Sequence, residues 1–184
     1  MQQQETDLAL ITKVLNGDTA VYSDLVKRHQ RFVFTLALRF TKNREDAEEV
    51  AQDCFVKAYR ALGTFKQTSK FSTWLYSITY TSAMTALRKK KLITQSLDDD
   101  EQTIQLPDPG TEGKSDSVEK KSAHVYLNRA IDSLSADDAA IITLFYKGEQ
   151  SLEEIGAALY METNTVKVKL HRQGSNSKKN YNIC

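Results

Sequence analysis

The chain has 184 residues, of which 40% are hydrophobic and 27% charged, and its formal net charge is +1. This balance is typical of a globular protein with one large or two small domains, and it excludes a disordered or fibrous chain. The sequence has two prolines, Pro107 and Pro109, and lacks the regular turn signals of a β-sandwich. The composition therefore favours helices, with a break near residue 107.

Several classes of protein are disfavoured on simple grounds. No apolar run approaches the ~20 residues that span a bilayer, and the polar start of the chain is no signal peptide. Cys54 and Cys184 lie far apart, and the three histidines are scattered, so the sequence predicts no metal site and no cofactor. Cys54 is expected to be a small buried residue of a cytoplasmic protein without membrane insertion.

The near-zero net charge conceals a segregation of charge along the chain. Residues 1–92 carry 15 basic and 9 acidic side chains, whereas residues 93–121 carry 3 and 8. Residues 122–162 carry 2 basic and 7 acidic side chains, and residues 163–184 carry 5 basic and no acidic ones. Two basic blocks favour two contacts with a polyanion such as nucleic acid, although solvated helix faces also produce charge runs.

The prolines divide the chain into modules. Residues 92–120 read as an acidic, flexible linker, because they contain the run 98–101 of like charges and the Pro- and Gly-rich stretch 106–113, which cannot hold a helix. The expected organisation is all-α, with two small helical domains at 1–91 and 121–184 joined by this linker.

In the N-terminal domain, capping residues and apolar spacing predict four helices. Thr6 caps the first, which ends at Asn16-Gly17, and Asp18 caps the second, whose apolar residues recur about every 3.6 positions as far as Phe40. Asn43 caps the third, and Gly63 ends it. The fourth contains residues 71–87 and ends in the basic run 88–91.

The C-terminal domain is also predicted to contain four helices. The first covers roughly 121–133, Ser135 caps the second, and residues 151–154 form a capping box that opens the third. A break at 160–162 precedes the fourth, which Thr163 caps and Gly174 is expected to end early. Two short helices with a tight break indicate a helix-turn-helix, and the last helix carries donors without acids.

Aromatic residues in the fourth N-terminal helix suggest a further chemistry. Tyr76 and Tyr80 are four positions apart, on a face predicted to differ from that of Leu75, and basic residues follow at 88–91. Unpaired bases stack on aromatic rings and phosphates bind basic side chains, so this helix is predicted to hold melted DNA. The polar loop 64–70 beside it is a candidate pocket for an extruded base.

These segments resemble a known family. Residues 46–62, 71–78 and 87–90 look like region 2 of a bacterial extracytoplasmic-function sigma factor, and residues 146–156 and 165–172 resemble region 4 of the same family. The resemblance covers nearly the whole chain, with both motifs in the family's order. It implies a non-enzymatic protein that binds core RNA polymerase and directs it to promoters.

The resemblance also implies roles for individual residues. The third helix would dock on the clamp coiled coil of the polymerase through Asp46, Glu49, Gln52 and Asp53. The minus-ten element would be recognised and melted by Lys66, Ser69, Trp74, Tyr76, Tyr80, Arg88, Lys89 and Lys90. The last helix would read the minus-thirty-five element through Thr165, Lys167, Val168, Lys169, His171 and Arg172. The polymerase flap, promoter DNA and an anti-sigma factor are the further expected partners.

The sequence departs from the family pattern at Thr81, at Val168 and over residues 173–177, which replace the usual Arg-Ala and apolar helix end. Thr81 stands where asparagine is usual. Val168 stands where a polar residue is usual, so a base contact from Val168 is limited to an apolar one such as a thymine methyl. Two rival readings also remain. A magnesium-dependent hydrolase would use the acidic residues 45–53, but no second helix offers convergent carboxylates. A helix-turn-helix repressor would bind duplex operator DNA tightly without polymerase.

Overall fold

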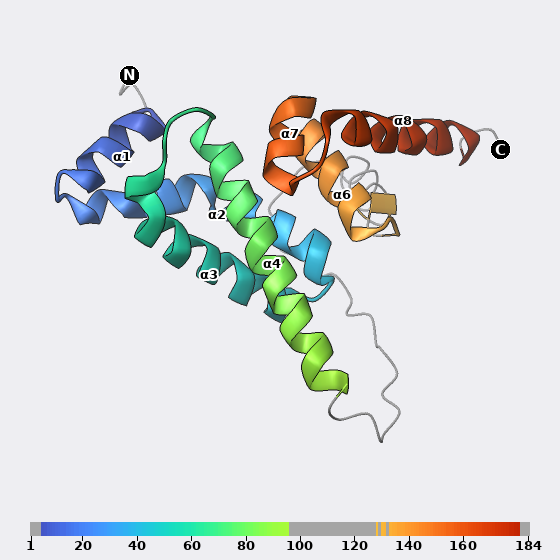
Figure 1. The fold of residues 1–184 in the computed structure, drawn as a ribbon, viewed down its shortest axis with the longest axis horizontal. Coiled ribbons are helices and arrows are strands. Elements are labelled where there is room, and N and C mark those ends of the chain that lie inside the picture. Colours follow the sequence, from blue (N-terminus) through green and yellow to red (C-terminus); the bar gives the residue numbers. More distant parts are fainter. Residues whose placement is uncertain (1–4, 96–127, 129, 132, 181–184) are drawn as a thin grey trace, which may run out of the picture.

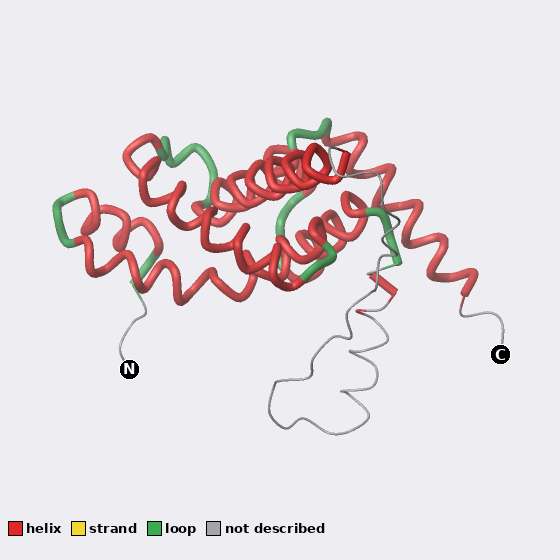
Figure 2. The backbone as a smooth tube through the Cα atoms, turned by 90° about the horizontal axis from the view of Figure 1, so that it is seen from below, coloured by secondary structure: helices red, strands yellow, loops and turns green. Residues whose placement is uncertain are grey.

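The structure is a computed structural model that describes residues 5–95, 128, 130, 131 and 133–180, with side chains described to residue 93 in the first range and to residue 172 in the last. Within these residues every regular element is a helix (Figures 1 and 2), which confirms the all-α class. Most of the predicted linker and of the predicted helix at 121–133 lies outside the described residues, although 128, 130 and 131 are helical.

The N-terminal domain has the four predicted helices: α1 (Asp7–Leu15), α2 (Tyr22–Thr41), α3 (Arg44–Ala61) and α4 (Phe71–Gln95). Short 3-10 turns occupy Thr19–Val21 and Leu62–Thr64. The helices α2, α3 and α4 pack pairwise against one another, and α1 packs on α2. Their buried side chains recur at helical spacing, so each helix presents one apolar stripe to a shared core.

Most predicted helix ends are confirmed by their hydrogen bonds. Thr6 accepts a hydrogen bond from the backbone of Ala9, Asn43 accepts one from Asp46, and Gly17 adopts a positive φ of 104° after α1. Asp18 was predicted to cap α2, and this is wrong: α2 begins at Tyr22, and the Asp18 side chain makes no capping hydrogen bond.

Two helices are longer than predicted. The linker was expected to begin at residue 92, but α4 continues to Gln95, because Lys, Leu and Ile all sustain a helix. Gly174 was expected to end the last helix early, but α8 runs from Thr163 to Asn180. One glycine inside a helix costs only about 1 kcal/mol relative to alanine, which is too little to stop it.

The C-terminal domain contains α6 (Ala136–Ile142), a π-helical turn (Thr143–Lys147), α7 (Leu152–Leu159) and α8. Ser135 caps α6, and Ser151 forms the predicted capping box with Glu154 at the start of α7. Tyr160 has a positive φ of 55° and ends α7, so the chain turns sharply into α8. In Figure 1, α7 lies beside α4 and α8 extends away from the N-terminal domain.

The two domains share one hydrophobic core. A single cluster of buried residues includes Leu36 and Leu75 from the first domain and Leu144 and Ile155 from the second. Gly148 lies at this contact, where an added Cβ would come within 2.9 Å of the Phe32 ring and 2.7 Å of a backbone oxygen. We call this contact, made by α2 and α4 with α6, the π-helical turn and α7, the domain interface.

Polar side chains are also buried in the domain interface. Arg39, only 4% exposed, donates to the hydroxyl of Thr143 at 3.3 Å and to the side-chain oxygen of Asn128 at 3.0 Å. The hydroxyl of Thr73 donates to the side-chain oxygen of Gln150 at 2.8 Å, and both residues are buried. Buried polar groups demand such partners, so these bonds fix how the two domains face each other.

Among the described residues, no helix has the length and apolar character needed to cross a bilayer. No group of three histidine, cysteine or acidic side chains in this part of the chain is arranged to hold a metal ion. Cys54 is buried as predicted, and burial raises the pKa of its thiol to about 11.

Candidate polymerase and nucleic-acid interface

The outer face of α3 brings together the residues predicted to bind polymerase. Its inner face buries Ala47, Val50, Cys54 and Ala58. Glu49 and Gln52 are exposed on the opposite side, with the half-buried Asp46 and Asp53 along the same helix. The Asp53 carboxylate pairs with Lys57 one turn later at 2.6 Å.

Sequence reasoning missed two apolar residues on this helix. Val56 is 48% exposed and Tyr59 is 42% exposed, and they lie three residues apart. Val56 follows Gln52 by four positions, so the two side chains are neighbours on the helix surface. Tyrosine is enriched at protein interfaces, so Tyr59 fits a protein-binding face, whereas a single exposed valine is common on any surface. The spacing 52–56–59 was the available signal in the sequence.

A groove of about 380 Å³ connects the start of α3 to the end of α4. Asp46 and Glu49 line one side, and Lys89 and Lys90 line the other. The Lys90 ammonium pairs with the Asp46 carboxylate at 2.7 Å across this groove. The structure therefore places part of the predicted polymerase set directly beside part of the predicted minus-ten set.

An aromatic cluster joins the loop 64–70 to the start of α4, with Phe65 from the loop and Phe71 and Trp74 from the helix. The Trp74 ring centroid lies 5.3 Å from that of Phe65 and 5.7 Å from that of Phe71. Phe65 and Phe71 are buried and Trp74 is half-buried, so the cluster fixes the loop 64–70 to the first domain. Lys66 and Ser69 are exposed on this loop, as a role in DNA binding requires.

Tyr76 was predicted to face away from the core, and this is wrong. It is 5% exposed, and its ring centroid lies 4.7 Å from that of Phe32 on α2. Burial raises the pKa of its hydroxyl above the usual value. Tyr80 is half-buried, with its ring centroid 5.4 Å from Phe40 and 6.1 Å from Tyr160 of the second domain. In this arrangement neither ring is open for stacking on a base.

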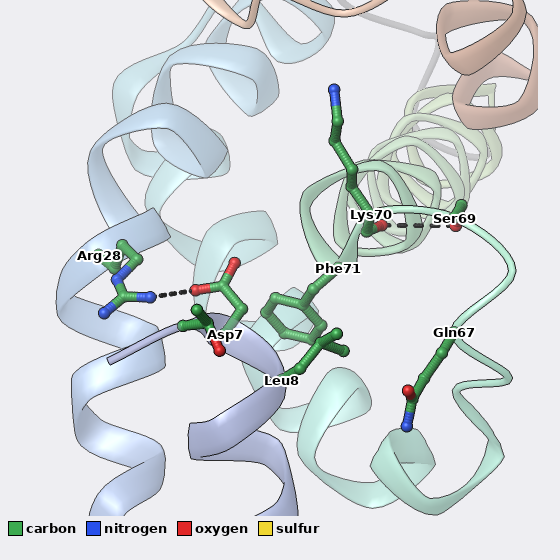
Figure 3. A pocket seen from close by; sticks show the side chains of 8 residues that line it. Asp7, Leu8, Arg28, Gln67, Ser69, Lys70 and Phe71 are labelled. Atoms are coloured by element: carbon green, nitrogen blue, oxygen red, sulfur yellow. Dashed lines mark hydrogen bonds and ion pairs between the residues drawn. The ribbon is translucent and has the colours of Figure 1, made fainter. Parts of the chain in front are cut away.

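A cavity of about 390 Å³ lies between the start of α1, α2 and the loop before α4 (Figure 3). The residues lining it are Thr6, Asp7, Leu8, Arg28, Gln67, Ser69, Lys70 and Phe71. Figure 3 shows the Phe71 ring beside Leu8, with the Lys70 side chain pointing away from both. The cavity thus has an apolar floor and a polar rim.

Asp7 is the charged centre of this cavity. Its carboxylate binds Arg28 at 2.5 Å and His29 at 2.9 Å. Burial alone would raise the pKa of Asp7, but the hydrogen bonds and charges of His29 and Arg28 outweigh it and lower the pKa. Asp7 is therefore ionised at neutral pH, and it joins α1 firmly to α2.

The second domain presents the predicted helix-turn-helix. Gly156 of α7 allows the close turn, because a Cβ there would lie 2.7 Å from the backbone oxygen of Met161. On α8, Val166 is buried and Leu170 half-buried, which fixes the helix to its domain. The predicted residues Thr165, Lys167, Val168, His171 and Arg172 are all exposed. Lys169 differs, because it is half-buried and pairs with Asp138 of α6 at 3.1 Å.

Comparisons with known proteins agree with this geometry. Residues 25–93 match the family model of sigma-70 region 2. The chain is 31% identical over 175 residues to the ECF RNA polymerase sigma factor SigW of Bacillus subtilis, covering 88% of this chain and 89% of the relative. It is 32% identical over 177 residues to the ECF RNA polymerase sigma-E factor of Escherichia coli K12, covering 94% and 92%. The chain belongs to the ECF RNA polymerase sigma factor family.

The fold of this ECF sigma factor is similar to one seen in a solved complex. The sigma factor RpoE, crystallised with the anti-sigma factor NepR from Bartonella quintana, superposes with a TM-score of 0.67 at 20% identity. The match covers 88% of this chain and 97% of that one. At this level of identity the likeness concerns the fold, and it agrees with the predicted all-α class.

Proposed function

We propose that this chain is an alternative sigma factor that binds core RNA polymerase and directs transcription from specific promoters. The proposal rests above all on the outer face of α3. Its polar and acidic residues, with the exposed Val56, lie on a rigid helix of the same domain that carries the candidate DNA-melting loop. A polymerase bound there would hold the loop and α4 close to the promoter.

Within this proposal, Asp46, Glu49, Gln52 and Asp53 contact the polymerase clamp. Docking on an exposed helix face needs no rearrangement of the first domain, because the opposite face holds the core. The second domain contacts the polymerase flap. An anti-sigma factor is the expected regulator, since RpoE, whose fold is similar, forms a complex with the anti-sigma factor NepR.

Minus-ten recognition is assigned to the loop 64–70 and to the exposed side of α4. The residues concerned are Lys66, Ser69, Trp74, Tyr80, Arg88, Lys89 and Lys90. We assign the cavity under this loop to an extruded base, since its polar rim offers hydrogen bonds. Tyr76 is left out of this set because it is buried.

Minus-thirty-five recognition is assigned to the exposed face of α8, which enters the major groove. Lys167, His171 and Arg172 supply donors for bases or phosphates, and the 59% exposed Val168 supplies an apolar contact such as one to a thymine methyl. A protein with these roles needs no catalytic residue or cofactor, and it works in the cytoplasm with the polymerase and the chromosome.

The domain interface adds a condition to this proposal. Gln150, Glu154 and Tyr160 of the second domain contact Thr73, Lys70 and Tyr80 of the first. These contacts cover the start of α4, which the proposal assigns to melted DNA. The two domains must therefore separate before α4 can act, and we expect the free chain to bind promoter DNA weakly.

The test is run-off transcription with purified core polymerase over a library of genomic promoter fragments. We expect transcripts from a small set of fragments, and only when this chain is added. No transcript above that of core polymerase alone would reject the proposal. Tight, sequence-specific binding of the free chain to duplex DNA would instead favour a helix-turn-helix repressor.

A further inference from the structure

Asp138 is a buried carboxylate that faces the helix proposed to read DNA. It lies in the first turn of α6, is 4% exposed, and its backbone N–H donates to the hydroxyl of Ser135 at 3.3 Å. One carboxylate oxygen lies 3.1 Å from the ammonium of Lys169. The other lies 3.8 Å from the guanidinium of Arg172.

The partners of Asp138 stabilise its ionised form. Burial raises the pKa of Asp138, but hydrogen bonds from Lys169 and Ser135 lower it, and the net direction is downward. Asp138 is thus an anion at neutral pH. A buried anion strongly disfavours the loss of its cation, because removing one partner leaves an uncompensated charge. Lys169 is consequently committed to α6.

Lys169 and Arg172 differ in how strongly they are bound to Asp138. The Lys169 side chain is 29% exposed, whereas that of Arg172 is 71% exposed and its distance to Asp138 is longer. Arg172 therefore keeps access to solvent and to a ligand. Lys169, paired with a buried carboxylate, is less available to a ligand than an exposed lysine is.

Lys169 lies on the flank of α8 that faces α6, and its pairing with Asp138 keeps it from the reading face. Successive residues are rotated by about 100° in an α-helix, and α8 uses the buried Val166 and the half-buried Leu170 to pack on its domain. The side opposite to these two carries Asn164, Val168, His171 and Arg172, which are all exposed, and the exposed Lys167 lies on the other flank from Lys169. Lys169 projects between the packed side and α6.

We propose that Asp138 is a positioning residue for minus-thirty-five recognition, holding Lys169 away from DNA so that Asn164, Val168, His171 and Arg172 read the groove with Thr165 and Lys167 at its edges. This inference rests on the proposed function. It removes Lys169 from the DNA-contacting set and adds Asn164. The gain is in selectivity, since an additional free lysine would bind phosphates of any sequence.

The first experiment counts phosphate contacts. Binding of the full-length chain to a labelled random-sequence duplex is measured by fluorescence anisotropy over a range of salt concentrations. Each phosphate contact steepens the dependence of log K on log salt by about 0.9. We expect D138N to steepen the slope by about one contact, because Lys169 is released. The control D137N removes the same charge one residue away and leaves Lys169 paired.

Two further variants make the test specific. K169Q alone should leave the slope of the parent chain unchanged, and adding K169Q to D138N should abolish the extra contact. The inference is overturned if D138N behaves as D137N does, or if K169Q alone reduces the slope by one contact. The double variant removes both charges of the pair and leaves no buried charge uncompensated, so its slope decides the question even if D138N or K169Q alone does not fold.

A second readout is selectivity. With core polymerase present, transcripts from a library randomised in the minus-thirty-five element are sequenced for the parent chain, D137N and D138N. We expect D138N to accept more sequences, and equal selectivity in the three proteins would overturn the inference. A parent chain that supports no transcription rejects the proposed function itself. Normal transcription with equal slopes and selectivity rejects only the role of Asp138.

Discussion

Replacing Thr73 with valine tests whether the domain interface keeps the free chain closed. The substitution is nearly isosteric and removes the hydroxyl that donates to Gln150 at 2.8 Å. The side-chain amide of Gln150 still donates to the backbone oxygen of Gly148 at 2.9 Å, so the residue stays in place. Its oxygen would then be buried without a donor in the closed form and hydrated in the open form.

An unsatisfied buried acceptor costs about 1–3 kcal/mol. This corresponds to a shift of about 5-fold to 150-fold in the equilibrium between closed and open forms, since about 1.4 kcal/mol is tenfold. Binding of single-stranded DNA by the free chain should tighten by the same factor until the open form becomes the majority. The effect of T73V should largely disappear once polymerase holds the domains apart.

The assay is energy transfer between two dyes. They are attached to cysteines that replace the exposed Glu48 on α3 and Glu153 on α7, in a chain that also carries C184S. The control is T81V, since the exposed Thr81 hydroxyl donates only to backbone oxygens of α4 within the described part of the chain. We expect lower transfer for T73V and no change for T81V. Unchanged transfer and unchanged binding of single-stranded DNA by T73V would refute the proposed closure, provided circular dichroism shows both variants folded.

Three other substitutions test the remaining assignments. D53R should weaken co-purification with core polymerase without loss of folding, because Asp53 is on the surface and its salt bridge is to Lys57 on the same helix. The control is D24R on α2. Normal co-purification of D53R would show that Asp53 is not part of the interface. K89A should weaken promoter binding by the holoenzyme at low salt but not at high salt, and an equal defect at all salt concentrations would contradict a phosphate contact. G156A should lower the free energy of unfolding by about 1–3 kcal/mol, because its Cβ would meet the Met161 oxygen at 2.7 Å, whereas G63A, with 3.9 Å to the nearest side-chain atom, should have little effect in thermal denaturation.

Local signals in the sequence predicted most of the fold. Thr6, Asn43, Ser135 and Ser151 form the caps that their side chains predict, since a cap depends on residues three positions away. The exposure of the outer α3 face followed from the helical spacing of its buried residues. Errors at helix ends, as at Gln95, arose where no residue forbids another helical turn.

The candidate site was less predictable because it depends on contacts between distant segments. Tyr76 is buried by Phe32, 44 positions earlier in the chain, and nothing in the local pattern of α4 indicates this. Lys169 is held by Asp138 from another helix, and its spacing on α8 alone suggested a DNA contact. A sequence pattern gives the face of a helix, but it does not give which neighbour covers that face.

The weak DNA binding that we expect of the free chain has two possible causes, which differ in their response to salt. Lys90 pairs with Asp46 and Lys70 pairs with Glu154, so part of the positive charge proposed for DNA is neutralised within the chain. Both lysines are 61% exposed, and such pairs contribute at most about 1 kcal/mol and less in salt. Each pair accounts for about a fivefold loss of affinity at most, and the two together for about 30-fold. The domain interface, with its shared apolar core and buried hydrogen bonds, opposes DNA binding at any salt concentration. D46N should therefore strengthen DNA binding slightly and only at low salt, whereas T73V should act at low and high salt alike; the reverse pattern would identify charge pairing as the main restraint.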